Sequence, residues 1–202
     1  MADVIVVSTH NKGKIREMEE IVKALGFEIA TRDEIGIDPS MEIEEDGETF
    51  EENSYKKAYE IMKLCSRPTM ADDSGLMVDA LNGEPGVYSS RYGGIEGDDK
   101  NNIKKLLHEL EGVPYEKRTA RFETVITLLF PDGEKIVCSG ECRGHISLEP
   151  MGDKGFGYDP VFIPDGYEET FGQLGPEVKN QFSHRSKALT QLKEKLENRN
   201  NK

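Results

Sequence analysis

The stretch Thr69-Met70-Ala71-Asp72-Asp73-Ser74-Gly75 combines a predicted structural element with candidate functional residues. Its small and apolar residues predict a short buried strand, and two adjacent carboxylates end that strand. Ser74-Gly75 then predicts a turn, after which residues 76–78 resume an extended run. Carboxylates this close resist joint ionisation unless cations or hydrogen-bond donors lie beside them, and a divalent metal would meet that need. The alternative is a polar turn in which Asp72 or Asp73 caps the local backbone.

Length and composition indicate an ordinary globular chain. Its 202 residues suffice for one substantial core or for two lobes that share one sheet. The apolar run Val4 to Val7 is too short for a signal peptide, and no stretch reaches membrane-spanning length. The three cysteines are Cys65, Cys138 and Cys142, and they lack the partners of a zinc site. Reduced thiols in a cytoplasmic protein are therefore expected.

The charge balance restricts the class of partner. The formal net charge is -13, and the sequence contains no run of Lys or Arg residues. A nucleic-acid polymer is therefore not expected as a partner, because binding one needs many phosphate contacts. A small anionic substrate remains compatible if a few cations and a metal converge locally.

A strand, a polar turn and a helix open the chain. Residues 3–7 predict a buried strand, and the helical spacing of Ile15, Met18, Ile21 and Leu25 predicts a helix closed by Gly26. The turn between them aims backbone N–H groups and a helix N-terminus at any ligand there. Three of its side chains suit a triphosphate: Thr9, Asn11 and Lys14. It is not a P-loop, since the upstream glycine is missing, and an ordinary connection with an Asn turn is the alternative.

An acidic stretch precedes the next helix. Met41 and Ile43 alternate with Glu42 and Glu44, which predicts a short strand ending in the acidic residues 44–48. Thr49-Phe50-Glu51-Glu52 has the form of a capping box and opens a helix. That helix carries Phe50, Ala58, Ile61 and Leu64, and it places Asn53 and Lys57 on one face. The acidic residues are either a solvated loop or inward-turned metal ligands.

The middle of the chain carries structural signals. Residues 82–86 predict a turn, and Asp98 begins a helix with a full apolar stripe. Alternation from Ala120 to Phe130, a Pro-Asp-Gly turn and the run Glu134 to Ile146 predict a hairpin in the middle of the sheet.

A glycine-rich loop and a basic helix start follow. In the loop 152–160, glycines flank Phe156, so Phe156 or Tyr158 can stack on a flat ligand while Asp159 accepts from a ring N–H. A tight loop with a core aromatic is the alternative. Pro176 opens a turn with Lys179, and Ser183 can cap a last helix with the stripe Leu189, Leu192 and Leu196. His184 and Arg185 lie in its first turn, where cations oppose the helix dipole, which suggests a nearby anion or polar ring atom.

Six motifs occur in one order along the chain and together resemble one family. They are Thr9-His10-Asn11-Lys12-Gly13-Lys14, Thr49-Phe50-Glu51-Glu52-Asn53, Ala71-Asp72-Asp73-Ser74-Gly75, Pro85-Gly86-Val87-Tyr88-Ser89, Phe156-Gly157-Tyr158-Asp159-Pro160 and Ser183-His184-Arg185. The chain resembles the Ham1/RdgB family of inosine/xanthosine triphosphate pyrophosphatases from residue 3 to residue 197.

The resemblance implies an α/β fold with a long central mixed β-sheet, flanking helices and two lobes with the active-site cleft between them. Residues 1–197 then form one domain of two lobes, and residues 198–202 a frayed tail. The resemblance further implies Mg2+ as the cofactor, a homodimer, and a small-molecule purine nucleoside triphosphate as the substrate.

The resemblance also implies roles for individual residues. Asp73 is the expected general base, and Lys57 an expected catalytic residue that contacts the phosphates or substrate. Glu44 and Asp73 are the expected metal ligands, with Glu45 or Glu48 able to share the role of Glu44. The expected phosphate and substrate contacts are Thr9, His10, Asn11, Lys12, Gly13, Lys14 and Ser74. The expected base pocket and its surroundings are Phe156, Gly157, Tyr158, Asp159, Lys179, His184 and Arg185.

The function that follows is hydrolysis of ITP, dITP and XTP to the monophosphate and pyrophosphate. Donors from His184, Arg185 or the backbone near Asp159 would bind the 6-oxo group and reject the 6-amino group of adenine. Two alternatives remain open: a non-hydrolytic nucleotide-binding module, and a related pyrophosphatase that acts on pyrimidine nucleotides.

Overall fold

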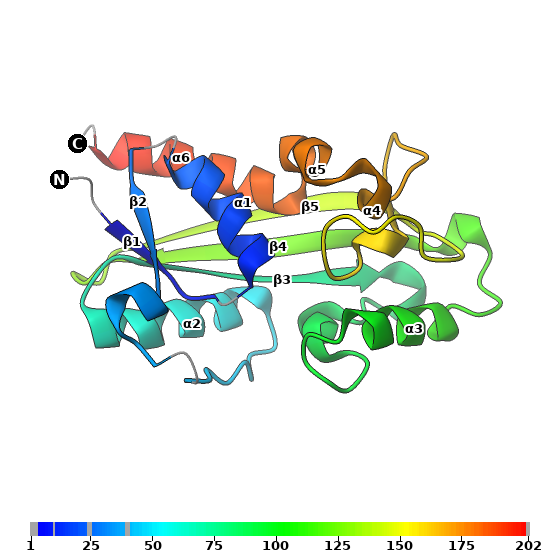
Figure 1. Ribbon diagram of the computed structural model, residues 1–202, viewed down its shortest axis with the longest axis horizontal. Coiled ribbons are helices and arrows are strands. Elements are labelled where there is room, and N and C mark those ends of the chain that lie inside the picture. Colours follow the sequence, from blue (N-terminus) through cyan, green and yellow to red (C-terminus); the bar gives the residue numbers. More distant parts are fainter. Residues whose placement is uncertain (1–3, 10, 24–25, 39–40, 201–202) are drawn as a thin grey trace. The chain divides into compact units, whose positions relative to one another are not determined.

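The computed structural model describes residues 4–9, 11–23, 26–38 and 41–200. Its helices and strands follow one another as shown in Figure 1. In chain order they are β1 (Val4–Val7), α1 (Lys12–Lys23), β2 (Glu28–Thr31), α2 (Phe50–Cys65), β3 (Thr69–Val78), α3 (Asp99–Glu109), β4 (Thr119–Leu129), β5 (Lys135–Ile146), β6 (Phe162–Pro164), α4 (Phe171–Leu174), α5 (Pro176–Phe182) and α6 (His184–Asn200). None of the helices that the structure describes is long and apolar enough to cross a membrane.

The strands form one mixed sheet in the order β2-β1-β3-β4-β5-β6. Strand β1 runs parallel to both β2 and β3, and β5 runs antiparallel to β6. Between β4 and β5 the chain turns tightly, with the N–H of Phe130 donating to the carbonyl of Glu134 at 2.9 Å. The predicted hairpin and the predicted mixed α/β fold are both confirmed.

The chain divides into two compact units. Unit 1 consists of Met1–Asp73, Thr124–Gly140 and Arg185–Lys202, and unit 2 of Ser74–Glu123 and Glu141–His184. Strands β3, β4 and β5 contribute residues to both units. The cleft implied by the family resemblance stays a prediction.

In unit 1, strand alternation separates two faces of β3. Met70 packs in a core with Met18 of α1 and Leu189 of α6, whereas Ala71 packs with Ala58 of α2. Successive side chains of a strand point to opposite faces, so the next two residues follow the same division. Asp72 therefore lies on the face covered by α1 and α6, and Asp73 on the face covered by α2.

The turn predicted at Ser74-Gly75 is wrong. Strand β3 is continuous from Thr69 to Val78. Among the described residues its pairing with β1 covers only Thr69 and Met70, and β4 is its other neighbour in the sheet. The hydroxyl of Thr124 in β4 also donates to the main-chain carbonyl of Asp73 at 3.2 Å. Pairing along a central strand outweighs the turn preference of a Ser-Gly pair.

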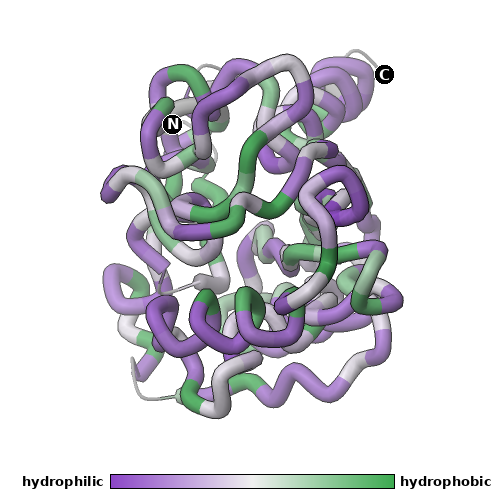
Figure 2. Tube along the Cα trace, turned by 90° about the vertical axis from the view of Figure 1, so that its right-hand side faces the viewer, coloured by the Kyte–Doolittle hydropathy of each residue, from purple (hydrophilic) through white to green (hydrophobic). Residues whose placement is uncertain are grey.

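Unit 2 has its own apolar core beneath α3. It joins α3 to the sheet and to the segment that follows β6, and its largest members include Leu76, Leu106, Leu110, Phe122, Phe162 and Phe171. In Figure 2 hydrophobic and hydrophilic residues alternate along the helical coils, as expected for helices buried on one side only. The predicted stripe of α3 and its N-cap at Asp98 are confirmed.

Three further expectations need correction or restriction. Residues 41–47 form no strand, because their backbone pairs with no neighbour in the sheet. Leu64, assigned to the apolar set of α2, is 58% exposed, since it falls on the outer side of the helix. Helix α6 continues through Asn200, and residues 201–202 lie outside the described part, so the fraying expected for residues 198–202 stays a prediction.

The capping box predicted at the start of α2 is present. Thr49 Oγ1 accepts from the N–H of Glu52 at 3.2 Å, and the Glu52 carboxylate accepts from the N–H of Thr49 at 3.1 Å. The box sets the first turn of α2, from which Asn53 and Lys57 project.

We expect Thr49→Ala to lower the free energy of unfolding by about 1 kcal/mol, because the first turn of α2 loses its N-cap acceptor. The matched control is Thr190→Ala at an exposed position inside α6, where the loss of a β-branched residue should leave stability unchanged or slightly higher. Urea unfolding of the two variants measures the difference. Equal stabilities would show that the capping box contributes nothing.

Candidate active site

Asp73 is the centre of a charged group in unit 1. Its side chain is buried, with Oδ1 accepting from Lys57 Nζ at 2.8 Å and Oδ2 accepting from Asn53 Nδ2 at 3.2 Å. Lys57 Nζ also lies 3.2 Å from Glu45 Oε1. Asn53 and Lys57 are four residues apart on α2, so one helix face supplies both donors, as predicted.

The environment shifts the pKa values of this group. Burial raises the pKa of Asp73, and the charge of Glu45 adds to the rise, although Lys57 opposes it. Burial alone would lower the pKa of Lys57, but Asp73, Glu45 and Asp72 together raise it. Asp73 is thus a carboxylate whose basicity exceeds that of an exposed aspartate, beside a permanently charged lysine.

The acidic residue that joins this group is Glu45 and not the predicted Glu44. Glu44 is exposed and faces Lys56, whereas Glu45 is half-buried beside Lys57. Exposure alternates through residues 42–48, with Ile43, Glu45 and Gly47 on the less exposed side. The sequence carried this signal, because the alternation that puts Ile43 inward also puts Glu45 inward.

Asp72 holds a separate charged group on the opposite face of β3. Its Oδ2 lies 3.1 Å from Lys14 Nζ and 3.0 Å from Arg185 Nη2, and Arg185 also pairs with Glu17 of α1. Burial would raise the pKa of Asp72, but Lys14, Arg185 and Lys57 hold it well below its usual range. Burial lowers the pKa of Lys14 despite the attraction of Asp72. The anion expected near Arg185 is therefore supplied within unit 1 by Asp72 and Glu17.

The turn before α1 is organised by its own polar side chains. Asn11 Oδ1 accepts from the N–H groups of Gly13 at 2.9 Å and Lys14 at 3.1 Å, and Thr9 Oγ1 accepts from the N–H of Asn11 at 3.2 Å. Lys12 is exposed at the first position of α1, and His10 lies outside the described residues. Asn11 thus caps α1, which holds the side chain of Lys14 toward Asp72.

In unit 2 the glycine-rich loop closes on a buried ion pair. Asp159 Oδ2 accepts from Lys179 Nζ at 2.8 Å and from the N–H of Phe156 at 3.0 Å. A Cβ on Gly155 would lie 2.1 Å from this oxygen, and Gly155 has φ +80°, so only glycine fits there. Lys179 Nζ lies 4.5 Å from the ring centroid of Phe156, which therefore rests on a fixed cation.

Two further residues of the loop have different surroundings from those expected. Tyr158 is buried and donates its hydroxyl to the carbonyl of Ser89 at 2.9 Å, and burial raises its pKa. It is a core anchor, so Phe156 is the aromatic left to stack on a ligand. The N–H of Gly157 donates to Asp99 Oδ2 at 2.7 Å, which ties the loop to α3.

The predicted base-pocket residues fall in both units. His184 is buried in unit 2 and stacks on Phe122 with centroids 4.8 Å apart, whereas Arg185 belongs to the Asp72 group of unit 1. Ser74 is half-buried in β3, directly after Asp73. Sequence reasoning missed the contacts of Glu17 and Asp99, because nothing local marks a helix carboxylate that pairs far along the chain.

The donor set around Asp73 suits a hard cation. The carboxylates of Asp73 and Glu45 both pair with the ammonium group of Lys57. Mg2+ is commonly held by one or two carboxylates together with substrate phosphates. No cluster of three or more His, Cys, Asp or Glu side chains gathers as a metal site within the described ranges. No disulfide joins Cys65, Cys138 or Cys142 within the described residues.

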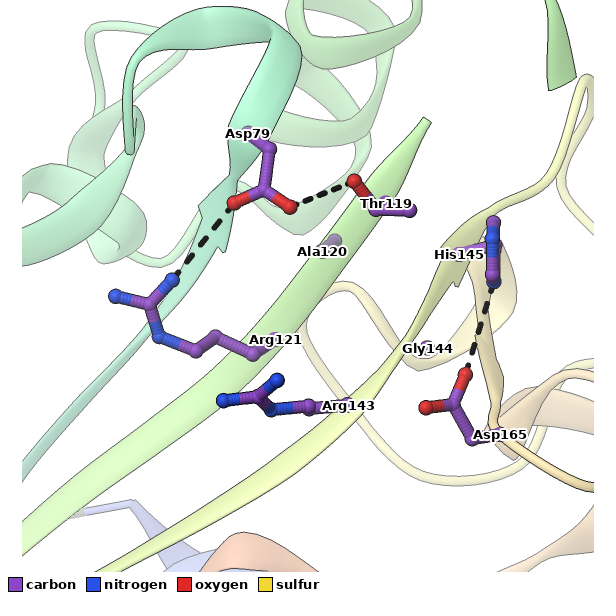
Figure 3. A pocket seen from close by; sticks show the side chains of 8 residues that line it. All are labelled: Asp79, Thr119, Ala120, Arg121, Arg143, Gly144, His145 and Asp165. Atoms are coloured by element: carbon purple, nitrogen blue, oxygen red, sulfur yellow. Dashed lines mark hydrogen bonds and ion pairs between the residues drawn. The ribbon is translucent and has the colours of Figure 1, made fainter. Parts of the chain in front are cut away.

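A polar pocket of about 420 Å³ lies elsewhere in unit 2 (Figure 3). Its charged groups pair with carboxylates: Arg121 with Asp79, and His145 with Asp165. Both Arg121 and Arg143 also contact Glu141. None of the predicted site residues lines the pocket, and we assign it no role because its charges compensate one another.

Comparison with known proteins shows that the chain is similar to the members of one protein family. Residues 5–195 match the model of the Ham1 family. The chain is 47% identical to the dITP/XTP pyrophosphatase of Halalkalibacterium halodurans over 188 residues, which cover 93% of this chain and 95% of that protein. It is 48% identical to the dITP/XTP pyrophosphatase of Geobacter sulfurreducens over 192 residues, covering 95% and 96%. The solved structure of the Staphylococcus aureus Ham1 protein matches with a TM-score of 0.86 and 40% identity, covering 98% of this chain and 100% of that one.

We expect Asp72→Asn to lower the free energy of unfolding at pH 7 by about 3–5 kcal/mol, because the half-buried Lys14 and the buried Arg185 lose their shared anion. The pKa of Asp72 is lower in the folded chain than its ordinary value of 3.8. Its contribution is therefore complete above that value and is lost as the pH falls through it toward the lower folded pKa. Urea unfolding between pH 7 and pH 3 should show a flatter acid dependence in the variant.

The control for that measurement is Asp153→Asn in an exposed loop, which should keep both the stability and the acid dependence of the parent chain. An Asp72→Asn chain that matched this control would show that the Asp72 group does not stabilise the fold.

Proposed function

Since this chain belongs to the Ham1 family, we propose that it hydrolyses non-standard purine nucleoside triphosphates of the dITP and XTP kind. The products are the nucleoside monophosphate and pyrophosphate, and the activity removes deaminated purines from the nucleotide pool. The observation that carries the proposal is the buried group of Asp73, Lys57 and Glu45 in unit 1.

Asp73 has the properties of the general base. A base needs a pKa closer to neutrality than that of a free aspartate, and burial together with Glu45 shifts Asp73 in that direction. In the reaction, the oxygen of water bonds to a phosphorus of the α–β phosphoanhydride as the bridging P–O bond breaks, and Asp73 accepts a proton from that water. The monophosphate and pyrophosphate then separate. Buried donors on both oxygens keep the carboxylate in one orientation, so little reorganisation accompanies the step.

Lysines supply the positive charge that phosphates require. Lys57 stays protonated because its pKa is raised, and it stands beside the base. Lys14 projects from the first turn of α1, where backbone N–H groups and the helix dipole also favour anions. We assign both to the triphosphate, with Thr9, Asn11, Lys12, Gly13 and Ser74 as its further contacts.

Mg2+ is the cofactor that this donor set fits, with Asp73 and Glu45 as its protein ligands. When bound, it would supply charge neutralisation to the phosphate oxygens. Glu45 replaces Glu44 in this assignment, because Glu45 shares Lys57 with Asp73 and Glu44 does not reach that group.

We assign base recognition to unit 2. Phe156 can stack on the purine, and His184 is the donor candidate for a 6-oxo group, because the main-chain N–H groups of Phe156 and Gly157 already donate to Asp159 and Asp99. Arg185 takes no part in this recognition in our assignment, because Asp72 and Glu17 hold its guanidinium. Such a donor rejects adenine, whose 6-amino group would leave it unpaired.

The cellular setting is part of the proposal. We expect a cytoplasmic homodimer without nucleic-acid or membrane partners, in keeping with the acidic composition. A non-hydrolytic nucleotide-binding module would not require a buried carboxylate with a raised pKa beside a lysine. The motifs Phe156-Gly157-Tyr158-Asp159 and Ser183-His184-Arg185, which the chain shares with the Ham1 family, disfavour a pyrimidine-nucleotide pyrophosphatase.

Pyrophosphate release from a panel of nucleotides tests the activity. ITP, dITP and XTP should be hydrolysed in Mg2+ with kcat/KM at least about 100-fold above ATP, because adenine carries a 6-amino donor where these substrates carry a 6-oxo acceptor. The pyrimidine nucleotides dCTP and dUTP should be similarly poor substrates, because they lack the purine ring. Asp73→Asn should lower kcat by about 10²- to 10⁴-fold without loss of fold, since the proton acceptor is removed. Tight ITP binding without turnover would favour the binding module, and preference for dCTP or dUTP the pyrimidine enzyme.

The paired variants Glu45→Gln and Glu44→Gln test the metal assignment. Glu45→Gln should lower kcat on the order of 100-fold and raise the Mg2+ concentration that gives half-maximal activity, because one charged ligand is lost. Glu44→Gln is its matched control, being the same exchange one residue away, and should stay within about twofold of the parent. The reverse result, with Glu44 the sensitive residue, would restore the original assignment.

A further inference from the structure

We propose that Asn53 is a positioning residue. It holds the Asp73 carboxylate and the acidic loop before α2 (residues 44–48) in fixed positions relative to each other. The inference rests on the proposed function and concerns a residue with no role in it so far. Asn53 is fully buried, and its two side-chain polar atoms form hydrogen bonds with Gly47 in the acidic loop and with the Asp73 carboxylate.

The amide of Asn53 bridges two segments. Its Oδ1 accepts from the N–H of Gly47 at 2.8 Å, and its Nδ2 donates to Asp73 Oδ2 at 3.2 Å and to the Gly47 carbonyl at 3.5 Å. A backbone N–H requires an acceptor and a carboxylate requires a donor, so this orientation is the only one that satisfies both neighbours. An aspartate or a leucine of similar size cannot do so.

The contact with Gly47 is close enough to exclude other residues there. A Cβ on Gly47 would lie 2.7 Å from Asn53 Oδ1 and 2.8 Å from the Cβ of Glu52. The backbone of the loop therefore rests directly on the first turn of α2. Glu52 extends this attachment by accepting from the N–H groups of Glu48 at 2.8 Å and Thr49 at 3.1 Å.

This attachment locates Glu45, which precedes Gly47 by two residues. Glu45 reaches Lys57, the residue one helical turn beyond Asn53 on the same face of α2. Asn53 and Lys57 thus hold one oxygen of Asp73 each, and Asn53 anchors the loop from which Glu45 comes. Outer-shell partners of this kind orient ligating carboxylates.

The adjacent residue provides a matched control. Ser54 is equally buried on α2, but its hydroxyl contacts Thr127 Oγ1 at 2.8 Å and the Glu51 carbonyl at 3.0 Å, away from Asp73. A general disturbance of α2 should affect Asn53 and Ser54 variants alike, whereas loss of positioning should affect only Asn53 variants.

The test compares Asn53→Ala, Asn53→Asp and Ser54→Ala by steady-state kinetics and by hydrogen exchange over residues 44–48. Asn53→Ala should lose about 10- to 100-fold in kcat with KM within about threefold of the parent, because the Asp73 carboxylate loses its amide donor while substrate contacts remain. Asn53→Asp should lose at least as much in kcat, because it removes the same donor and sets a second carboxylate beside Asp73. Asn53→Asp keeps the acceptor for the Gly47 N–H, so exchange there should stay slow, whereas Asn53→Ala should accelerate it. Ser54→Ala should keep parental kcat and exchange.

Parental kcat in Asn53→Asp would overturn the proposal, as would parental exchange at Gly47 in Asn53→Ala. Asn53→Asp preserves size and one hydrogen bond, so it remains informative if Asn53→Ala does not fold. A parent chain that releases no pyrophosphate from any nucleotide would refute the proposed function instead, and the exchange comparison would then decide alone whether Asn53 anchors the loop.

Discussion

Two neighbouring carboxylates, both removed from water within one strand, impose the main constraint on unit 1. A buried carboxylate is tolerated only when cations or hydrogen-bond donors surround it, and two adjacent ones would compete for the same partners if they faced the same way. Strand β3 separates them, because Asp72 and Asp73 point to opposite faces. Each then has its own cations, from α1 and α6 on one face and from α2 on the other.

The two groups differ in what their surroundings do to the carboxylate. Asp72 lies between Lys14 and Arg185, and its pKa is held low, so it remains a fixed anion. Asp73 shares Lys57 with Glu45, and its pKa is raised, so it can take a proton. Asp72 thus pairs with cations from the first turns of α1 and α6, whereas Asp73 is available to accept a proton. A cation in the first turn of a helix is unfavourable because it opposes the helix dipole. Arg185 occupies that position in α6, and its pairing with Asp72 compensates for the unfavourable placement.

Unit 2 achieves order by a different route. The glycine-rich loop has little intrinsic preference for one conformation, yet the Asp159–Lys179 pair, the hydroxyl of Tyr158 and the carboxylate of Asp99 each bind it. Such buried pairs add little net stability, because desolvation offsets their attraction, but they select one arrangement among many. The ring of Phe156 is thereby fixed before any ligand arrives, which reduces the entropy lost on binding.

Local signals in the sequence determined the elements whose stability comes from near neighbours. The capping box of α2, the apolar stripe of α3, the hairpin of β4 and β5, and the shared face of Asn53 and Lys57 all depend on residues within a few positions. The ordered motifs also determined the family, because each motif combines residue types with spacing.

Tertiary structure alone decided the rest. The place of β3 inside the sheet kept Ser74-Gly75 extended against the local turn signal. Arg185 joined Asp72 through a contact 113 positions apart along the chain. Neighbouring residues cannot specify such contacts, because hydrogen bonding across a sheet and the burial of charge depend on which distant segments the fold brings together.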